Sequence, residues 1–313
     1  MYIGIDLGGT NIAVGLVNEN KEIIAKKSIP TLKERHYKEI VKDMAEVSKK
    51  VVKEAGYDIS DIKAVGIGCP GTTDNERGLV LYCNNIAMRN APLAEEFRKH
   101  FDVPVSLIND ADAAAYGEYC AIGRKMHSFI FVTLGTGVGG GIIINDKIYS
   151  GFNNSGGELG HTTLYVDGKA CTCGRNGCLE QYASVTALGE QTKQKMNKHP
   201  ESLMHEWVKK RGRISGRTAF ECAKRGDKAA IEVKEQYIRY VAEGVCNFVN
   251  IFQPEMLVIG GGISKEGDEL LIPIKKFVKE FDYNKDDPKT EIKIAQLFND
   301  AGIIGAAMAT LMK

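Results

Sequence analysis

A pattern of apolar strand, glycine-rich turn and apolar strand occurs twice in this chain. Residues 3–17 read IGIDLGGTNIAVGLV, and residues 131–144 read FVTLGTGVGGGIII. Short apolar runs on either side of a glycine turn favour β-hairpins. The chain has 313 residues, which is more than a single hydrophobic core usually supports. The repeat therefore predicts two related domains.

Between the hairpins, short apolar runs alternate with segments of helical periodicity, which is typical of the α/β class. Helices are expected over 36–56, 91–101 and 111–123, and strands over 22–29 and 105–110. Residues 179–251 read as mostly helical. A strand at 256–260, another near 292–298 and a last helix over 302–312 complete the pattern. The repeat places a domain boundary near residues 118–124.

Composition and charge exclude several classes of protein. The net charge is +1, so nothing indicates a nucleic-acid partner or an anionic membrane surface. No apolar run is long enough to span a bilayer, and MYIGIDLGG has no basic region typical of a signal peptide. We therefore expect a cytoplasmic protein without nucleic-acid or membrane partners.

The glycine turns favour phosphate binding. Without a Cβ, successive backbone N–H groups can approach an anion closely, and Thr10 and Thr136 add hydroxyl donors. One such turn alone is most simply a tight hairpin. Two matched turns and a third, GGGIS at 260–264, together indicate a phosphate cradle between related domains.

Two other nucleotide motifs do not fit. Gly135, Gly137 and Gly140 satisfy G-x-G-x-x-G, but a dinucleotide site requires a helix after the glycines, and here a β run follows. The G-x-x-x-x-G-K-[ST] motif of P-loop proteins does not occur.

Acidic residues stand at two strand ends. Asp6 precedes the first glycine turn, where a carboxylate suits Mg²⁺ held through water, although it could also stabilise the turn alone. Asn109, Asp110 and Asp112 follow a buried strand. One of them could cap the next helix, but carboxyl ends of strands face the ligand in α/β sheets. We predict Asp110 as the base that accepts a proton from an attacking hydroxyl, with Asp112 less favoured.

One histidine and three of the eight cysteines form a metal-binding pattern. His161, Cys171, Cys173 and Cys178 read H-x9-C-x-C-x4-C, which is the donor set of tetrahedral zinc. All four positions are filled, so the zinc should be structural. Four unrelated residues would be the alternative, and H-E-x-x-H of metalloproteases does not occur. The other cysteines are most simply packing residues.

Two glutamates flank the metal pattern. Glu158 lies three residues before His161, and Glu180 lies two after Cys178. Zinc would fix both carboxylates near one point, where they could accept hydrogen bonds from vicinal hydroxyls. A neutral polyol such as a sugar suits this pair better than an acidic substrate.

Seven motifs occur in the order found in the ROK family of repressors, open-reading-frame proteins and sugar kinases. They are DLGGTN, CPG, NDADAAA, LGTGVGGG, GELGH, CxCGxxGCxE and GGGIS. The resemblance runs from Ile3 to about Ala307, and within the family the chain looks most like a bacterial glucokinase. The cysteine motif is specific, whereas the glycine turns alone are not.

The resemblance implies a two-domain, actin-like and ribonuclease-H-like fold with an inter-domain cleft. The small domain would comprise 1–118 and 302–313, and the larger one, with the zinc site, 119–301. It implies phosphorylation of a free hexose, most simply D-glucose, by Mg-ATP, in a homodimer or homotetramer. It implies ATP contacts from Asp6, Gly8, Gly9, Thr10, Asn11, Gly135, Thr136, Gly137, Gly261 and Gly262. It implies sugar contacts from Gly71, Asn85, Asn109, Asp110, Glu158, His161 and Glu180.

Met88 stands where an aromatic residue is frequent in the family. It is either core packing or a softer wall of the sugar pocket, so N-acetylmannosamine, N-acetylglucosamine, fructose and allose stay open as substrates. Family repressors carry a DNA-binding module ahead of the kinase-like part. The first glycine turn begins at Gly8, so we expect no such module. A sugar-binding module without catalysis would require that Asp110 or the glycine turns be missing.

Overall fold

The structure, a computed structural model, describes residues 1–312; Lys313, the last residue of the predicted segment 302–313, lies outside the described residues. The chain divides into two compact units. The first unit comprises Met1–His127, Gly141–Gly157 and the chain from Gln296 onward, and the second comprises Ser128–Gly140 and Glu158–Ala295.

The first unit is built on a five-stranded sheet of order β3-β2-β1-β4-β8. Strand β1 pairs antiparallel with β2 and parallel with β4, which pairs parallel with β8. Parallel pairing brings the carboxyl ends of β1, β4 and β8 to one edge, where α/β sheets bind ligands. The strands are β1 (Tyr2–Leu7), β2 (Asn11–Val17), β3 (Ile23–Pro30), β4 (Ala64–Cys69) and β8 (Val105–Asn109).

A second five-stranded sheet has the order β11-β10-β9-β12-β13. Strand β12 pairs parallel with both β9 and β13, and β10 pairs antiparallel with β11. The strands are β9 (Ser128–Leu134), β10 (Val138–Ile144), β11 (Lys147–Ile148), β12 (Met256–Gly260) and β13 (Glu291–Ile294).

Both sheets therefore have the same order when the strands of each are counted along the chain, 3-2-1-4-5. This order is that of the ribonuclease-H-like fold, and its duplication is that of actin-like proteins. The predicted α/β, actin-like fold is confirmed, and the two glycine hairpins are the first two strands of each copy.

A third, three-stranded sheet was not predicted. It has the order β5-β6-β7 and inserts between β4 and β8 of the first unit. Its strands are too short to show a clear period in the sequence. They are β5 (Thr72–Asp74), β6 (Leu79–Cys83) and β7 (Met88–Ala91).

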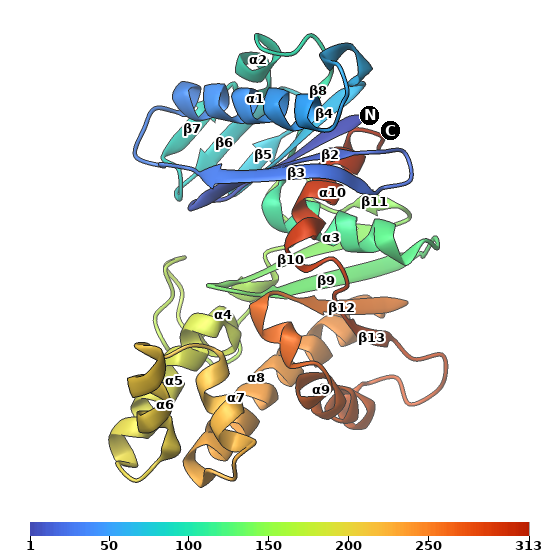
Figure 1. The fold of residues 1–313 in the computed structure, drawn as a ribbon. Helices are drawn as coiled ribbons and strands as arrows, with labels where there is room; N and C mark the ends of the chain where they lie inside the picture. The colour runs from blue at the N-terminus through green and yellow to red at the C-terminus, as the bar shows by residue number, and fades with distance from the viewer. Residues whose placement is uncertain (313) are drawn as a thin grey trace. The chain divides into compact units, whose positions relative to one another are not determined.

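Helices cover both faces of the first sheet, with α1 on one face and α10 on the other (Figure 1). Helix α1 is amphipathic, and its first turns bury Ile40, Val41 and Met44 in the main apolar cluster of this unit. The helices of this unit are α1 (Tyr37–Glu54), α2 (Leu93–Arg98), α3 (Asp110–Ile122) and α10 (Ala301–Ala309).

Helix α10 packs against β1, β4 and α3 at a distance that only small residues allow. A Cβ on Gly66 of β4 would lie 1.8 Å from the carbonyl oxygen of Ala306, and one on Gly305 would lie 1.7 Å from that of Ala113. All nine residues of α10 are buried. Backbone therefore contacts backbone, which fixes the position of α3.

The second unit is mostly helical outside its strands, as predicted for residues 179–251. Its longest helix, α8, buries Tyr237 and the residues one and two turns along the same face. No helix within residues 1–312 is both long and apolar enough to cross a bilayer. The helices are α4 (Glu180–Ala183), α5 (Val185–Lys198), α6 (Leu203–Arg211), α7 (Arg217–Ala223), α8 (Lys228–Phe252) and α9 (Asp268–Phe281).

Candidate active site

The junction between β8 and α3 holds the predicted base. Asn109, not Asp110, caps the helix: its Oδ1 accepts the N–H groups of Ala111 at 2.8 Å and of Asp112 at 3.2 Å. The Nδ2 of Asn109 also donates to the carbonyl of Gly71 at 2.9 Å. The Oδ1 of the Asp110 carboxyl accepts the Ala111 N–H at 2.9 Å.

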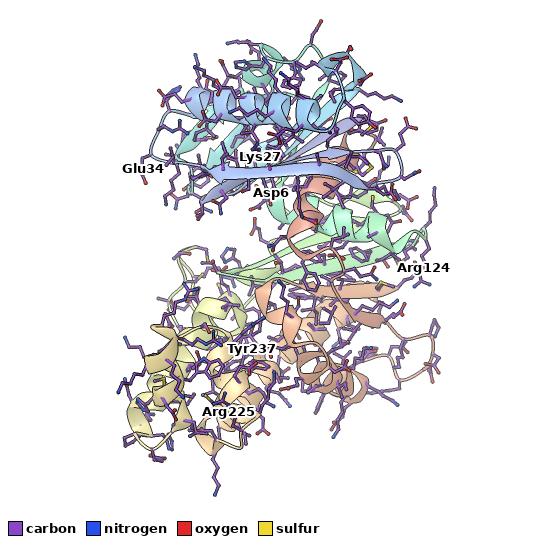
Figure 2. The ribbon with its side chains drawn as sticks, viewed as in Figure 1. Asp6, Lys27, Glu34, Arg124, Arg225 and Tyr237 are labelled. Atoms are coloured by element: carbon purple, nitrogen blue, oxygen red, sulfur yellow. The ribbon has the colours of Figure 1, made fainter. Side chains whose placement is uncertain are left out.

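Burial perturbs two acidic side chains of this unit. Burial raises the pKa of Asp110 above its usual value. Burial, and secondly the charge of Asp110, raise the pKa of Asp6 to about 6. Asp6 lies on β1 (Figure 2), and a Cβ on Gly302 at the start of α10 would be 3.0 Å from its Oδ2. A raised pKa brings a carboxylate closer to the range in which a general base works at neutral pH.

The first glycine turn is a tight loop beside Asn85. The Gly8 N–H donates to the carbonyl of Asn11 at 2.9 Å, which closes the turn. Thr31 fastens the turn from outside, because its Oγ1 donates to the Gly8 carbonyl at 2.6 Å. A Cβ on Gly9 would lie 3.6 Å from the Cβ of Asn85. Thr10 and Asn11 are exposed and free to meet a ligand.

Gly71 has no room for a side chain. Its φ is +90°, and a Cβ would lie 2.1 Å from the carbonyl oxygen of Tyr82. The first unit therefore gathers Gly71, Asn85, Asn109 and Asp110 around the carboxyl ends of β4 and β8. Asp6 reaches the same group from β1.

The second glycine turn carries Glu180. The carboxylate Oε2 of Glu180 accepts the Val138 N–H at 3.0 Å, and a Cβ on Gly137 would lie 2.2 Å from that oxygen. Glu180 is the first residue of α4. The last residue of this helix is held by α8, because the hydroxyl of Tyr237 (Figure 2) donates to the Ala183 carbonyl at 2.8 Å. Glu180, which is predicted to bind the sugar, therefore contacts the glycine turn that is predicted to bind phosphate.

A cavity of about 350 Å³ opens beside Gly135 and Thr136. The third glycine turn borders it: Gly262 lines the cavity, and Gly261 packs its backbone against Leu134 at the end of β9. The start of α5 and the loop after α6 form the remaining wall. These further lining residues, which the sequence analysis did not identify, are Val185, Thr186, Gly189, Ile214, Ser215 and Gly216.

A larger cavity of about 660 Å³ shares Val185, Ser215, Gly216 and Gly262 with the first. Its outer wall is basic and aromatic, with Trp207, Arg211, Arg213 and Arg217 among the lining residues. A Ser-Gly pair, Ser215 and Gly216, in an arginine-rich loop between two helices was the sequence signal for this wall.

The four predicted metal ligands come together. One ligand atom from each of His161, Cys171, Cys173 and Cys178 lies within 4.8 Å of the others. The Cys171 Sγ is 3.6 Å from the His161 Nδ1, and the Cys173 Sγ is 3.6 Å from the Cys178 Sγ. Tetrahedral zinc with bonds of about 2.3 Å to sulfur and about 2.0 Å to nitrogen needs ligand separations of roughly 3.5–3.8 Å. The residues therefore fit zinc.

The loop has the backbone that the cluster requires. Gly174 and Gly177 have φ of 90° and 76°, in the left-handed region that favours glycine. A Cβ on Gly177 would lie 1.6 Å from the carbonyl of Tyr165, so the loop is closed tightly at this point. Arg175 fastens it further by donating to the His161 carbonyl at 3.3 Å.

The two ring nitrogens of His161 face different groups. The Nδ1 faces the sulfur cluster, and the Nε2 lies 4.0 Å from the Glu158 Oε2. With zinc on Nδ1, the other nitrogen would carry a proton that can be donated. The Glu158 side chain is 67% exposed and that of His161 is 30% exposed, so both are accessible to a ligand.

Met88, the residue that departs from the family pattern, lies in the core. It is 2% exposed and belongs to the apolar cluster that also includes Ile86 and Val80. Of its two interpretations, core packing agrees with this position. Asp112 is also buried, with 8% exposed, which agrees with its lower rank as a base.

Comparison with known proteins extends the resemblance to the whole chain. Residues 2–313 match the ROK family. The chain is 36% identical to a glucokinase of Halalkalibacterium halodurans over 97% of its own length and 93% of that protein. It is 35% identical to a glucokinase of Thermotoga maritima over 97% of its length and 95% of that protein. A ROK family glucokinase from Streptomyces griseus, solved in complex with glucose and AMPPNP, is 35% identical and superposes with a TM-score of 0.83 over 98% of both chains. The chain belongs to the ROK family.

Proposed function

We propose that this protein is a hexokinase-type phosphotransferase that transfers the γ-phosphoryl group of ATP to the 6-hydroxyl of D-glucose. The observation that carries the proposal is the similarity, over 98% of both chains, to a glucokinase solved with glucose and an ATP analogue. The geometry within each unit supports it, because one unit offers a base beside a glycine turn and the other offers hydroxyl acceptors beside a second one.

Asp110 is the proposed base. Its carboxylate accepts the proton of the 6-hydroxyl while the hydroxyl oxygen bonds to the γ-phosphorus. The bond between the γ-phosphorus and the oxygen that bridges it to the β-phosphorus breaks, and ADP leaves. Asn109, which is held by its bonds to the helix and to Gly71, would fix the adjoining sugar hydroxyl. Phosphoryl transfer depends mainly on such positioning and on charge stabilisation.

The glycine turns are the proposed phosphate sites. Their backbone N–H groups, with the hydroxyls of Thr10 and Thr136, would bind the phosphate chain, and the cavity lined by Gly262 would take the rest of the nucleotide. The carboxylates of Asp6 and Asp110 are oxygen donors of the kind that Mg²⁺ prefers, and Mg²⁺ bound with ATP would neutralise charge on the phosphates. Asp6 would hold it through water.

Zinc at the cysteine cluster is proposed to be structural. The four protein ligands would fill all tetrahedral positions of a bound zinc ion, so none would remain for water or substrate. The ion would hold the Nδ1 of His161 and so aim its Nε2–H, with Glu158, at sugar hydroxyls. Glu180, held by Val138, would accept a further hydroxyl.

Two further properties follow from the family and are proposed with the activity. The functional domains would be 1–118 with 302–313 and 119–301, and the protein would form a homodimer or homotetramer in the cytoplasm without binding nucleic acid. Light scattering of the purified protein tests the assembly. Tight, specific binding in a gel-shift assay would favour a sugar-sensing regulator instead.

A coupled ADP-release assay with Mg-ATP tests the substrate. We expect the highest kcat/KM for glucose, with 2-deoxyglucose clearly poorer, because a buried polar site penalises a missing hydroxyl. N-acetylmannosamine, N-acetylglucosamine, fructose and allose complete the panel. An N-acetylhexosamine that exceeded glucose about tenfold would reassign the sugar and leave the sugar-kinase proposal standing, whereas no turnover of any sugar would contradict both.

A further inference from the structure

A buried carboxylate stands at the end of the third glycine turn. The turn continues as a short 3-10 helix, η3 (Gly262–Glu266), whose last residue is Glu266. Only 6% of the Glu266 side chain is exposed. A buried carboxylate is costly unless it is paired or hydrogen-bonded. The cations that meet Glu266 therefore help to hold the turn.

Helix α7 supplies these cations from its two ends. The Nζ of Lys224, the residue that follows α7, donates to the Glu266 Oε2 at 3.1 Å. The Nε of Arg217, the first residue of α7, lies farther away, 3.9 Å from the Glu266 Oε1. The bond to Glu266 is the foremost cause that raises the pKa of Lys224, so the lysine stays charged. The main partner of the buried carboxylate is therefore Lys224.

The two segments that this ion pair joins are also walls of the cavity proposed for the nucleotide. Gly262, at the start of η3, lines the cavity, and so do Ser215 and Gly216, which immediately precede α7. The walls come close to each other, because a Cβ on Gly216 would lie 3.6 Å from the Cδ1 of Ile263. The ion pair therefore links one wall to the other.

Lys224 and a second lysine have different places in one network of charges. Lys224 also lies 3.2 Å from Glu221 and 3.5 Å from Glu269 of α9. The Nζ of Lys234 on α8 lies 3.4 Å from the other carboxylate oxygen of Glu269. Lys234 thus joins α8 to α9, whereas Lys224 joins α7 to the glycine turn. Substitution of one or the other separates the role of the turn from the general stability of the network.

We propose that Glu266 and Lys224 are positioning residues for the nucleotide, because their ion pair holds the third glycine turn against the start of α7. This role rests on the proposed function, since the cavity concerned is the one proposed for ATP. Without the pair, Gly262 would lose its support relative to Ser215 and Gly216. A displacement of about 1 Å in a binding site is costly. Nucleotide affinity should therefore fall, and sugar affinity should not.

Glu266→Gln tests this role, because it keeps the size of the side chain and removes its charge. The KM for ATP should rise about fivefold, with kcat and the KM for glucose within about twofold of the wild type. Lys224→Met should raise the KM for ATP at least as much, because it leaves Glu266 buried without its main partner. Lys224→Arg keeps the cation and should raise it less than Lys224→Met does.

Lys234→Met is the matched control, because it removes a lysine of the same network that contacts Glu269 and not Glu266. It should leave the KM for ATP unchanged, even if thermal unfolding shows that it lowers stability. Equal effects of Lys234→Met and Lys224→Met on the KM for ATP would overturn the proposal. An unchanged KM for ATP in Glu266→Gln, or an equal rise in the KM for both substrates, would overturn it as well.

Calorimetric titration with Mg-ADP separates the role of the ion pair from the proposed function. The affinity for ADP should fall about fivefold in Glu266→Gln, whether or not any sugar is phosphorylated. A wild type that phosphorylates no sugar would contradict the kinase, and this loss of affinity would still support the ion pair. A wild type that phosphorylates glucose, with equal ADP affinity in Glu266→Gln, would support the kinase and overturn the role of the pair.

Discussion

The predicted sugar-binding residues of the first unit and those of the second are held in different ways. Asp110 stands where a paired strand enters a helix, and that helix is fixed by backbone contact with α10. Between Leu159 and Glu180 the chain has little regular structure, with only isolated bridges such as Thr163 to Cys178. Four ligand side chains take the place of a hydrogen-bond ladder there. One part should therefore keep its shape without an ion, and the other should depend on it.

The largest expected effect is at Asp110. Asp110→Asn keeps the shape of the side chain and removes the base, so kcat should fall by about 10²–10⁴-fold. The affinities for glucose and ATP should remain close to those of the wild type, because neither depends mainly on this charge. Steady-state kinetics and isothermal titration calorimetry measure both quantities.

The matched control is Asp112→Asn, two residues further along the same helix. We expect it to retain most of the activity, since Asp112 is buried within the protein. If Asp112→Asn were the more damaging variant, the base would have been assigned to the wrong acid.

In the segment that holds the metal ligands, residues 159–180, a substitution should act by disturbing structure and not by removing a base. Cys173 is exposed, so Cys173→Ser removes a ligand at small packing cost. Zinc content should fall, and kcat/KM for glucose should drop by roughly 10²-fold because Glu158 and His161 lose their positions. The fold of the first unit should be unaffected. Metal analysis, circular dichroism and kinetics check the three expectations.

Cys120→Ser is the control for this change, because Cys120 is a partly buried thiol outside the cluster. It should retain zinc and activity. A fully active wild-type protein without zinc would refute the structural role of the ion.

Two neighbouring glycines separate phosphate binding from sugar binding. A Cβ on Gly135 meets no atom within 4 Å, whereas a Cβ on Gly137 would lie 2.2 Å from the Glu180 Oε2. Gly135→Ala should therefore raise the KM for ATP alone, by obstructing the phosphates. Gly137→Ala should displace Glu180 and raise the KM for glucose, each by roughly tenfold. Equal effects of both changes on both substrates would show that the turn acts only as a structural hairpin.

The smallest expected effect is on the pH profile. Asp110 must be ionised to accept a proton, and its pKa is raised by burial. As the pH falls, activity should therefore be lost at a pH above 3.8, the usual value for aspartate. The profile of kcat/KM for glucose measures this, with circular dichroism at each pH to exclude unfolding. An acid limb at or below the usual value would indicate that the base is more hydrated than the structure implies.

Much of the fold could be predicted because local signals agree with it. The glycine hairpins, the strand before Asp110 and the helical stretch after residue 179 each have clear periodicity or turn residues, and all are found in the structure. The β5-β6-β7 sheet could not be predicted, because its strands are short and their pairing depends on contacts with the rest of the unit.

The site was predictable where chemistry is local. The spacing of His161 and the three cysteines identified a cluster that the structure brings together. The walls of the proposed nucleotide cavity could not be predicted, because Val185 and Ser215 are ordinary residues that line it only where distant segments meet. The sequence could not decide whether Asn109 or Asp110 caps the helix, since either side chain can do so. The structure assigns the cap to Asn109.

The packing of α10 has a consequence for synthesis of the protein on the ribosome. The strands that α10 covers are complete by Asn109, but α10 itself begins at Ala301. At about 5–20 residues per second, roughly 10–40 seconds pass before it can be added. During that time the glycine-lined faces of β1 and β4 have no covering helix, and the first unit cannot reach its final packing. The second unit is translated in full before the first can be closed.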